Sequence, residues 1–268
     1  MKNKVVIITG ASSGIGLATA KEFAKRGAKL VLAARNLEKL TELENELKTQ
    51  NVEVISVKTD VSIESDCKNL IEKAIEKYGT INILINNAGI SMRAIFTEVD
   101  LSVLKQLMDI NFWGTVYCTK YSLPYILENK GSVVGVSSIA GFKGLPGRTG
   151  YSASKFAMQG FLETIRIENL KKDLHVLIVA PGFTSSNIRN TALAADGSMQ
   201  GDSPLKEDKL MSAEEVALNI ANAVVKRKRT LILTLQGKLV VLLNKFFPKM
   251  LDKMSYNHMA KEPNSPFK

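Results

Sequence analysis

Lys4-Val-Val-Ile-Ile-Thr9-Gly-Ala-Ser-Ser-Gly-Ile-Gly16 places an apolar run, a glycine-rich turn and the start of a helical pattern in direct succession. The run 4–9 is typical of a buried parallel strand, and residues 17–26 predict a helix that Gly27 ends. Glycines let a backbone approach a phosphate closely, and a helix N-terminus offers free N–H groups and a positive dipole end. The sequence therefore predicts a phosphate-binding turn, although its G-x-x-x-G-x-G spacing differs from the more common G-x-G-x-x-G.

The same alternation of strand and helix continues along the chain. Repeated strand–helix units indicate one α/β domain built on a parallel sheet that is covered on both faces, and ligands bind such sheets beyond the carboxyl ends of the strands. The helix predicted at 63–78 would be capped by Ser62 at its start and ended by Gly79. The further strands are predicted at 29–34, 52–58, 81–85, 132–136, 174–180 and 230–235, and the further helices at 37–50, 63–78, 100–129 and 150–171.

The composition limits the classes of protein to consider. With 268 residues, 45% of them apolar, the chain is long enough for one large globular domain with a small appendage. Cys67 and Cys118 cannot form a disulfide framework, and the N-terminus lacks the pattern of a signal peptide, so we expect a reducing, cytoplasmic setting. The two histidines, His175 and His258, stand in no metal-ligand spacing, so we expect neither a metal site nor histidine catalysis.

The net charge of +10 is distributed unevenly. Residues 226–268 contain ten Lys or Arg and two Asp or Glu, which is +8 of the total. The basic character therefore belongs to the C-terminal tail and not to the domain. Because the tail has no module that reads bases, we do not expect nucleic-acid binding.

Ala34-Arg35-Asn36 ends the predicted second strand. In dinucleotide-binding folds, an acidic residue at this place binds the 2′-hydroxyl of the adenosine ribose, whereas an arginine accommodates a 2′-phosphate. The sequence has no acid here, and a guanidinium matches the geometry of phosphate. We therefore expect NADP (NADPH) rather than NAD as cofactor. The alternative is that Arg35 is an ordinary surface residue.

Tyr151-Ser-Ala-Ser-Lys155 puts a phenol and an ammonium four residues apart. On a helix both side chains leave the same face, one turn apart. An adjacent ammonium favours the phenolate, so the tyrosine could exchange a proton nearer neutral pH than a free phenol does. Taken alone, such a spacing is more often a solvated pair on a helix surface.

Further motifs stand where the predicted strands end. In chain order with the turn at 9–16 they are Asp60-Val61, Asn86-Asn-Ala-Gly89, Asn111, Ser138, Tyr151-x-x-x-Lys155 and Pro181-Gly182. In this combination the chain, over about residues 4–235, resembles the short-chain dehydrogenase/reductase (SDR) family and is similar to its hydroxysteroid dehydrogenase and ketoacyl reductase types. The resemblance implies a Rossmann-like, doubly wound parallel sheet of about seven strands in the order 3-2-1-4-5-6-7.

The resemblance also implies four catalytic residues. Tyr151 would be the general acid or base, and Lys155 would lower its pKa and hold the nicotinamide ribose. Ser138, rather than the structural Ser137, would hydrogen-bond the substrate oxygen. Asn111 would support Lys155 and a water molecule that relays the proton.

The cofactor would be held by the turn and by the strand ends. Asp60 and Val61 would border the adenine, and the segment after Pro181-Gly182 would close over the nicotinamide. Where the family usually has threonine this chain has Ser186, which leaves Thr184 and Ser185 also in reach of the carboxamide. The predicted cofactor-binding set is Gly10, Ser12, Ser13, Gly14, Ile15, Gly16, Arg35, Asn36, Asp60, Val61, Asn87, Ala88, Gly89, Tyr151, Lys155, Pro181, Gly182, Thr184 and Ser186. Within that set, Ser12, Ser13, Arg35 and Asn36 are the candidates for contact with the 2′-phosphate.

These roles imply an NADP-dependent oxidoreductase that interconverts a ketone or aldehyde and an alcohol by hydride transfer. Its expected substrate is an apolar carbonyl compound, either steroid-like or acyl-chain, and its expected assembly is a homodimer or homotetramer. The competing interpretation is a dinucleotide-binding regulator or scaffold without turnover. Segment 185–211 is predicted to be a mobile lid, or else an ordinary surface loop. The apolar pocket candidates are Ile90, Met92, Phe142, Leu145, Pro146 and Phe183.

Residues 236–268 form a basic extension after a catalytic domain at 1–235. Lysines recur at helical spacing from Lys238 and leave a broad apolar face, while Pro248 predicts a kink or the start of a second helix. Lys and Asn interrupt the apolar run too often for a membrane span. The helix could pack on the domain or across an oligomer interface. It could also lie on an anionic membrane, peripherally at the inner surface, or at the mouth of a lipid-substrate pocket.

Overall fold

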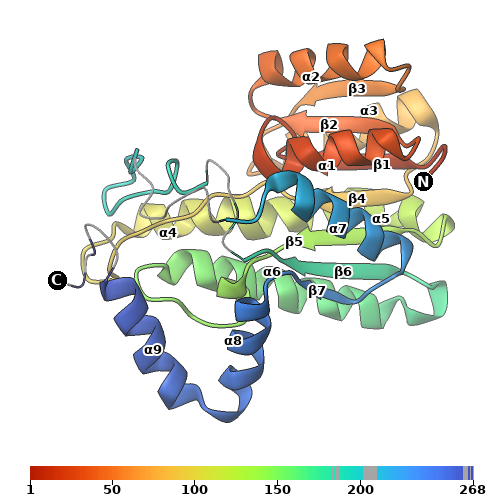
Figure 1. Ribbon diagram of the computed structural model, residues 1–268. Coiled ribbons are helices and arrows are strands. Elements are labelled where there is room, and N and C mark those ends of the chain that lie inside the picture. The colour runs from red at the N-terminus through yellow and green to blue at the C-terminus, as the bar shows by residue number, and fades with distance from the viewer. Residues whose placement is uncertain (183, 185–187, 202–209, 262–264, 266, 268) are drawn as a thin grey trace.

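The computed structural model describes residues 1–182, 184, 188–201, 210–261, 265 and 267. A parallel sheet crosses the molecule in the order β3-β2-β1-β4-β5-β6-β7, which confirms the predicted order (Figure 1). Its strands are short, apolar and mostly buried, as expected for a sheet covered on both faces. The strands are β1 Val5–Thr9, β2 Lys29–Ala34, β3 Val54–Lys58, β4 Ile83–Asn86, β5 Ser132–Val136, β6 His175–Ala180 and β7 Thr230–Ile232.

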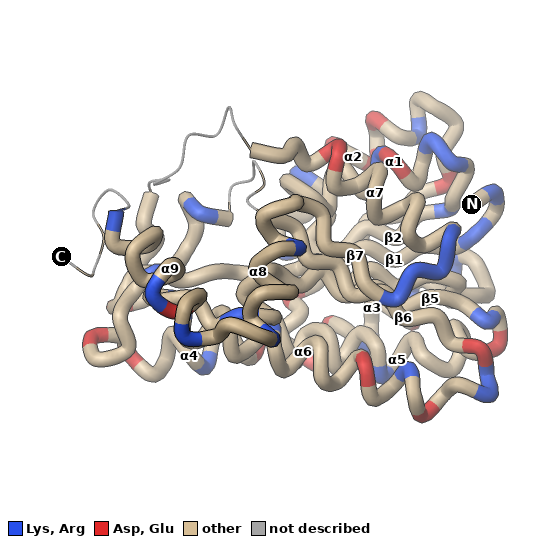
Figure 2. Tube along the Cα trace, turned by 60° about the horizontal axis from the view of Figure 1, so that its bottom comes forward, with Lys and Arg blue, Asp and Glu red and all other residues tan. Residues whose placement is uncertain are grey.

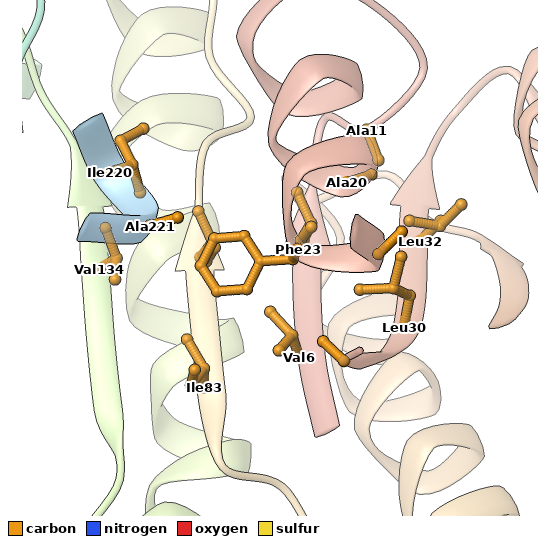
Figure 3. Close-up of a cluster of buried hydrophobic side chains, with 14 of the residues drawn as sticks. Val6, Ala11, Ala20, Phe23, Leu30, Leu32, Ile83, Val134, Ile220 and Ala221 are labelled. Atoms are coloured by element: carbon orange, nitrogen blue, oxygen red, sulfur yellow. The ribbon is translucent and has the colours of Figure 1, made fainter. Parts of the chain in front are cut away.

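Two groups of helices cover the two faces of the sheet. On one face, Phe23 is fully buried among side chains of four strands and of α7 (Figure 3). The opposite face has its own buried cluster, which includes Cys67 and Cys118. The first face is covered by α1 Gly14–Lys25, α2 Leu37–Thr49 and α7 Ala213–Val225, and the second by α3 Glu64–Tyr78, α5 Gly114–Glu128 and α6 Thr149–Glu168.

The register of the sheet decides where the polar motifs meet. Thr9 pairs with Ala33 of β2, and Ile8 pairs with Ile85 of β4. On the other side, Asn86 pairs with Gly135 of β5. Because every pair is parallel, the carboxyl ends lie along one edge, and the segments that follow β1, β2, β4, β5 and β6 converge there.

The long helix predicted at 100–129 contains a change of pitch. It consists of α4 Leu101–Leu107, a π-helical stretch Met108–Trp113 that we call η1, and α5. A π stretch rotates the following residues relative to an α-helix and is common at functional sites. Asn111 lies inside η1 and is fully buried.

One helix was not expected from the sequence, and two expectations for local structure were wrong. Helix α7 was not predicted, although Ser212 caps it by accepting a hydrogen bond from the backbone N–H of Glu215 (3.0 Å), a spacing typical of a helix start. The last strand ends at Ile232, because Thr234 caps a helix at that point. Ser62 does not cap α3, since the N-cap is Ile63 and the Ser62 hydroxyl donates to Asp60 Oδ1 (2.7 Å).

The C-terminal extension is a pair of helices, α8 Leu235–Phe246 and α9 Pro248–Ala260. Pro248 starts the second helix, which is one of the two roles predicted for it. In Figure 1 the pair forms a V whose tip points away from the sheet. Across the described ranges of the chain, every helix is too short or too polar to cross a membrane.

A buried histidine ties the last three strands together. His175 opens β6, and its Nδ1 lies 2.9 Å from the hydroxyl of Ser132 on β5. Its Nε2 lies 2.8 Å from the carbonyl oxygen of Lys228, just before β7. The carbonyl can only accept, so Nε2 carries the proton and Nδ1 accepts from Ser132. Burial lowers the pKa of His175 below its usual 6.5, opposed by the hydrogen bond to Lys228.

We predict that this imidazole contributes to a loss of stability in acid. The unfolded chain binds a proton at the usual histidine pKa of 6.5 while the folded protein resists it, so stability is present above that pH and is lost as the pH falls below it. Chemical denaturation from about pH 7.5 to about pH 5.5 should show a steeper loss of unfolding free energy in the wild type than in His175→Gln. Equal slopes in the two proteins would contradict the prediction.

Candidate active site

The turn between β1 and α1 has the backbone shape of a phosphate cradle. Gly10 and Gly14 have positive φ angles of 66° and 52°, which side chains other than glycine rarely adopt. A Cβ on Gly16 would lie 2.2 Å from the carbonyl oxygen of Gly10, so only glycine fits there. Ser13 stands at the N-cap of α1 without a side-chain capping hydrogen bond. The first turn of α1 therefore keeps its N–H groups available to an anion, and this geometry fits a dinucleotide pyrophosphate.

Thr9 and Asn87 lock this turn to the end of β4. The hydroxyl oxygen of Thr9 accepts hydrogen bonds from the backbone N–H groups of Asn87 and Ala88, each at 3.0 Å. The Asn87 amide donates to the carbonyl oxygens of Thr9 (2.9 Å) and Gly10 (3.2 Å). The predicted motif Asn87-Ala-Gly89 thus has a structural task, and Thr9, which was not among the predicted site residues, is its partner.

A cleft of about 490 Å³ runs along the carboxyl edge of the sheet and collects most of the predicted site. Gly16 and Asn111 lie behind its wall, and Ser186 is outside the described residues. Its lining also contains residues that sequence reasoning did not select. The predicted residues that line the cleft are Gly10, Ser12, Ser13, Gly14, Ile15, Arg35, Asn36, Asp60, Val61, Asn87, Ala88, Gly89, Ser138, Tyr151, Lys155, Pro181, Gly182 and Thr184, and the unselected ones include Thr59, Ser91, Gln106, Arg148 and Arg189.

At one end of the cleft, Arg35 is exposed directly after β2. Asn36 beside it caps α2, because its Oδ1 accepts from the backbone N–H of Lys39 (2.9 Å). The carboxylate of Asp60 accepts from the backbone N–H (3.0 Å) and the hydroxyl of Ser62. The guanidinium of Arg35 is therefore the cation best placed to meet a phosphate at this end.

At the other end, Tyr151 and Lys155 lie one turn apart near the start of α6. Lys155 is only 3% exposed. Its ammonium donates to the carbonyl oxygen of Val136, the last residue of β5 (2.9 Å), and lies 5.9 Å from the centre of the Tyr151 ring. Burial lowers the pKa of Lys155 to about 8. The pair is not the solvated surface pair that the spacing alone would allow.

Tyr151 is 9% exposed, and burial raises its pKa above the usual value of 10. A hydrogen bond with the Ser138 side chain and the positive charge of Arg148 act in the opposite direction. The expected lowering of this pKa by Lys155 is not met, because burial outweighs the neighbouring groups. A pKa above 10 means that the phenol is protonated at neutral pH.

The two serines after β5 have different surroundings. The Ser137 hydroxyl accepts from the side-chain amide of Gln159 (2.7 Å), which agrees with the structural role expected for it. The Ser138 hydroxyl caps the short helix η2 Ile139–Gly141, accepting from the N–H of Ala140 (3.2 Å), and faces Tyr151 in the cleft.

Asn111 holds a segment of backbone instead of contacting Lys155 directly. Its Oδ1 accepts from the N–H of Ile90 (2.8 Å), and its Nδ2 donates to the carbonyl oxygen of Ile90 (3.0 Å) and to the hydroxyl of Ser154 (2.9 Å). A Cβ on Gly89 would lie 3.0 Å from Asn111 Oδ1 and 3.3 Å from Lys155 Nζ. Asn111 and Lys155 therefore both lie close to Gly89, and a side chain at this position would press against both of them.

The segment after β6 packs over the cleft in the part that is described. The backbone of Leu193 bonds to Ser91 and Arg93, and Thr184 is buried with its hydroxyl donating to Gly182 (3.2 Å). Residues 185–187 and 202–209 of the predicted lid, and Phe183, are outside the described residues. Among the apolar pocket candidates, Ile90 lines the cleft, Met92 is fully buried core, Leu145 lines a second cavity, and Phe142 and Pro146 line neither.

Arg148 is a buried arginine that sequence reasoning missed. It is 8% exposed, and its guanidinium donates to the hydroxyl of Ser91 (2.9 Å) and to the carbonyl oxygen of Met92 (3.1 Å). These bonds join the start of α6 to the loop after β4. Its position three residues before Tyr151 was visible in the sequence, but nothing in the sequence indicated that it would be buried beside the phenol.

Comparison with known proteins identifies the family. The sequence model of the short chain dehydrogenase family matches residues 4–196. "Dehydrogenase/reductase SDR family member 7B" of Mus musculus is 37% identical over 239 residues, covering 87% of this chain and 74% of that protein. "11-beta-hydroxysteroid dehydrogenase 1A" of Arabidopsis thaliana is 38% identical over 236 residues, covering 84% of this chain and 67% of that protein.

Two solved structures of dehydrogenases are also similar to this chain. A short chain dehydrogenase/reductase from Burkholderia phymatum in complex with NAD superposes with a TM-score of 0.82 at 25% identity, covering 93% of this chain and 95% of that one. An alcohol dehydrogenase from Thermococcus sibiricus complexed with 5-hydroxy-NADP gives a TM-score of 0.76 at 26% identity, covering 87% of this chain and 96% of the other. The chain belongs to the short-chain dehydrogenase/reductase family and is an oxidoreductase acting on CH–OH groups.

Proposed function

We propose that this oxidoreductase uses NADP and interconverts an apolar ketone or aldehyde and the corresponding alcohol, with Tyr151 as the acid/base. The observation that carries the proposal is the meeting of three functional groups in one cleft. They are the phenol of Tyr151, the hydroxyl of Ser138 and the ammonium of Lys155. A protein that only bound a dinucleotide would not need a buried phenol and hydroxyl beside each other at the end of its cleft.

The chemistry follows from the protonation states. When bound, the nicotinamide would supply or accept the hydride. In reduction, the protonated phenol of Tyr151 donates its proton to the substrate oxygen, and in oxidation the phenolate removes it. The Ser138 hydroxyl donates to that oxygen as negative charge grows on it. Lys155, held by the carbonyl of Val136, would bind the nicotinamide ribose and keep a positive charge near the phenol.

The choice of NADP rests on Arg35. It is exposed at the adenosine end of the cleft, and the strand end that carries it has no acidic side chain for a ribose hydroxyl. Asn36 and the serines of the turn stand beside it as additional donors. The related structures were solved with NAD in one case and with 5-hydroxy-NADP in the other, so the family accommodates both forms.

The substrate class rests on a second cavity of about 610 Å³ that begins at the active site. Ser138, Pro181 and Gly182 line both it and the cleft. The second cavity continues between Leu145, Met211 and the C-terminal helices, so it is mainly apolar. Such a cavity suits a hydrocarbon body attached to the reacting carbonyl, in line with the hydroxysteroid dehydrogenase names among the relatives.

We also expect a homodimer or homotetramer, since members of this family are often oligomeric. Trp113 and Phe156 are 43% and 47% exposed on neighbouring helices that contact each other through Phe112 and Phe161. A second copy of the chain would cover these aromatic side chains.

The first prediction from the proposed function concerns Tyr151. Tyr151→Phe removes the proton donor but keeps the ring, so binding of NADPH should persist while kcat falls by about 10² to 10⁴. Tyr121→Phe is the matched control, because its hydroxyl donates to Glu64 at the surface, away from the cleft. NADPH consumption with a panel of ketones and long-chain aldehydes measures the effect. Turnover of the Tyr151 variant near the wild-type level would show that the acid/base is another group.

The second prediction concerns the cofactor. Arg35→Ala should raise the KM for NADPH by about 10- to 100-fold, which corresponds to the loss of a charged hydrogen bond, and leave the KM for NADH nearly unchanged. Lys48→Ala, which removes an exposed cation at the far end of α2, serves as the control. An equal effect of Arg35→Ala on both cofactors would contradict the assignment of the 2′-phosphate.

The third prediction concerns Arg148. Its charge lowers the pKa of Tyr151, and alcohol oxidation requires the phenolate, so Arg148→Gln should shift the rise of oxidation rate to higher pH. Arg148→Lys keeps the charge and should keep the midpoint near that of the wild type. If the two variants shift the pH profile equally, Arg148 acts only through its hydrogen bonds to Ser91 and Met92.

A further inference from the structure

The outer face of the C-terminal hairpin, which we define as residues 235–254, is apolar and exposed. Leu235, Leu239, Leu242 and Phe246 follow each other at the spacing of one helix face, and they are 73%, 48%, 54% and 68% exposed. Phe247, at the tip, is 56% exposed. An amphipathic helix normally turns such a stripe toward a core, but here it faces away from the protein.

The hairpin that carries this stripe is basic. The hairpin carries four lysines, which are exposed, and a single acid, Asp252 (Figure 2). That acid already pairs with Lys143 of the catalytic domain. The hairpin thus presents an exposed apolar stripe together with an excess of positive charge. The four lysines are Lys238, Lys245, Lys249 and Lys253.

The inner side of the hairpin is attached to the catalytic segment. Gly237 packs so tightly on Ile139, the residue after Ser138, that a Cβ would lie 2.6 Å from its Cδ1. The side-chain amide of Asn244 donates to the carbonyl oxygen of Phe142 (3.2 Å). The position of the hairpin is therefore fixed relative to the catalytic serine.

The apolar cavity of about 610 Å³ lies between these two parts. It starts at Ser138 and reaches Met254, which lines it and is also 54% exposed. Met211 and Met259 add further flexible apolar side chains to the wall. The cavity thus connects the inner side of the hairpin with the reacting groups.

We propose that the hairpin docks on an anionic phospholipid bilayer and that the second cavity admits an acyl-chain carbonyl substrate from that bilayer to Ser138 and Tyr151. The substrate part of this inference rests on the proposed function, whereas the docking part does not. Insertion of the apolar stripe and attraction of the lysines to lipid phosphates together give the two contributions that hold an amphipathic helix at a membrane.

The charges favour a membrane over a second copy of the chain as the occupant. A symmetric contact through this face would bring four lysines against the same four lysines. The one acid within the hairpin is already bonded to Lys143 and would not relieve that repulsion. An anionic surface instead complements every lysine at once.

Flotation of the full-length protein tests the docking. The probes are vesicles of phosphatidylcholine alone and vesicles of phosphatidylcholine with phosphatidylglycerol. The wild type should float with the anionic vesicles, less so at high salt, and weakly with the neutral ones. The double variant Leu242→Glu/Phe246→Glu should lose at least about tenfold in vesicle binding, because two apolar side chains leave the bilayer. Both positions are exposed, so the fold should be retained.

Leu170→Glu is the matched control. Leu170 is 67% exposed in the short helix Leu170–Lys172 just before β6, at the opposite edge of the sheet, and its variant should float like the wild type. Absence of wild-type flotation with anionic vesicles, or equal flotation of the hairpin variant, would overturn the proposal. The proposal would also be overturned if the wild type binds no vesicles and sedimentation shows that the hairpin substitutions convert an oligomer into smaller species.

Activity measurements with two ketones distinguish a failure of this inference from a failure of the proposed function. With a long-chain methyl ketone held in anionic vesicles, the hairpin variant should lose rate in parallel with its binding. With a short water-soluble ketone it should keep the wild-type rate. Loss of both rates would assign the hairpin to the catalytic fold and overturn the delivery role. Failure of every variant and of the wild type on both ketones would instead refute the proposed function, while flotation would still report on docking.

Discussion

The parallel pairing of β1, β4, β5 and β6 is the constraint on which the site depends. Because their carboxyl ends share one edge, a turn at residue 10, an asparagine at 87, a serine at 138 and a lysine at 155 come together although they are far apart in the chain. The hydrogen bonds of Thr9 and Asn87 lock two of these ends to each other. A slip of one residue in this register would turn each inward side chain to the other face and separate the proposed catalytic groups.

Burial then sets the chemistry. Lys155 is enclosed beside the end of β5, where the carbonyl oxygen of Val136 satisfies its ammonium, and its pKa falls to about 8. Burial also raises the pKa of Tyr151, while Ser138 and Arg148 partly offset the rise. The same enclosure thus keeps the phenol protonated as a donor and makes its ionisation depend on a few neighbours. Arg148 belongs to this set through its charge, and its bonds to the loop after β4 fix its place.

Much of this arrangement could be predicted from the sequence. The glycine-rich turn follows from a spacing tied to backbone geometry, whereas the strand order and the convergence of Ser138, Tyr151 and Lys155 were implied by the resemblance of the motifs to the short-chain dehydrogenase/reductase family. The burial of Arg148 and the second cavity could not be predicted, because they depend on packing between distant segments. The predicted lowering of the Tyr151 pKa was wrong for a related reason. Residue spacing shows that an ammonium is near the phenol, but it does not show how deeply both groups are buried. Helix α7 was missed although Ser212 and Glu215 carried its start signal.

The central claim is that the phenol of Tyr151, the hydroxyl of Ser138 and the ammonium of Lys155 surround the reacting end of one bound cofactor. A crystal structure of the protein with NADPH tests it most directly. The nicotinamide ring should lie beside Tyr151 and Ser138, with its ribose on Lys155 and the 2′-phosphate at Arg35. A nicotinamide ring bound away from Tyr151, or a Tyr151 hydroxyl that points out of the cleft in the complex, would contradict the account.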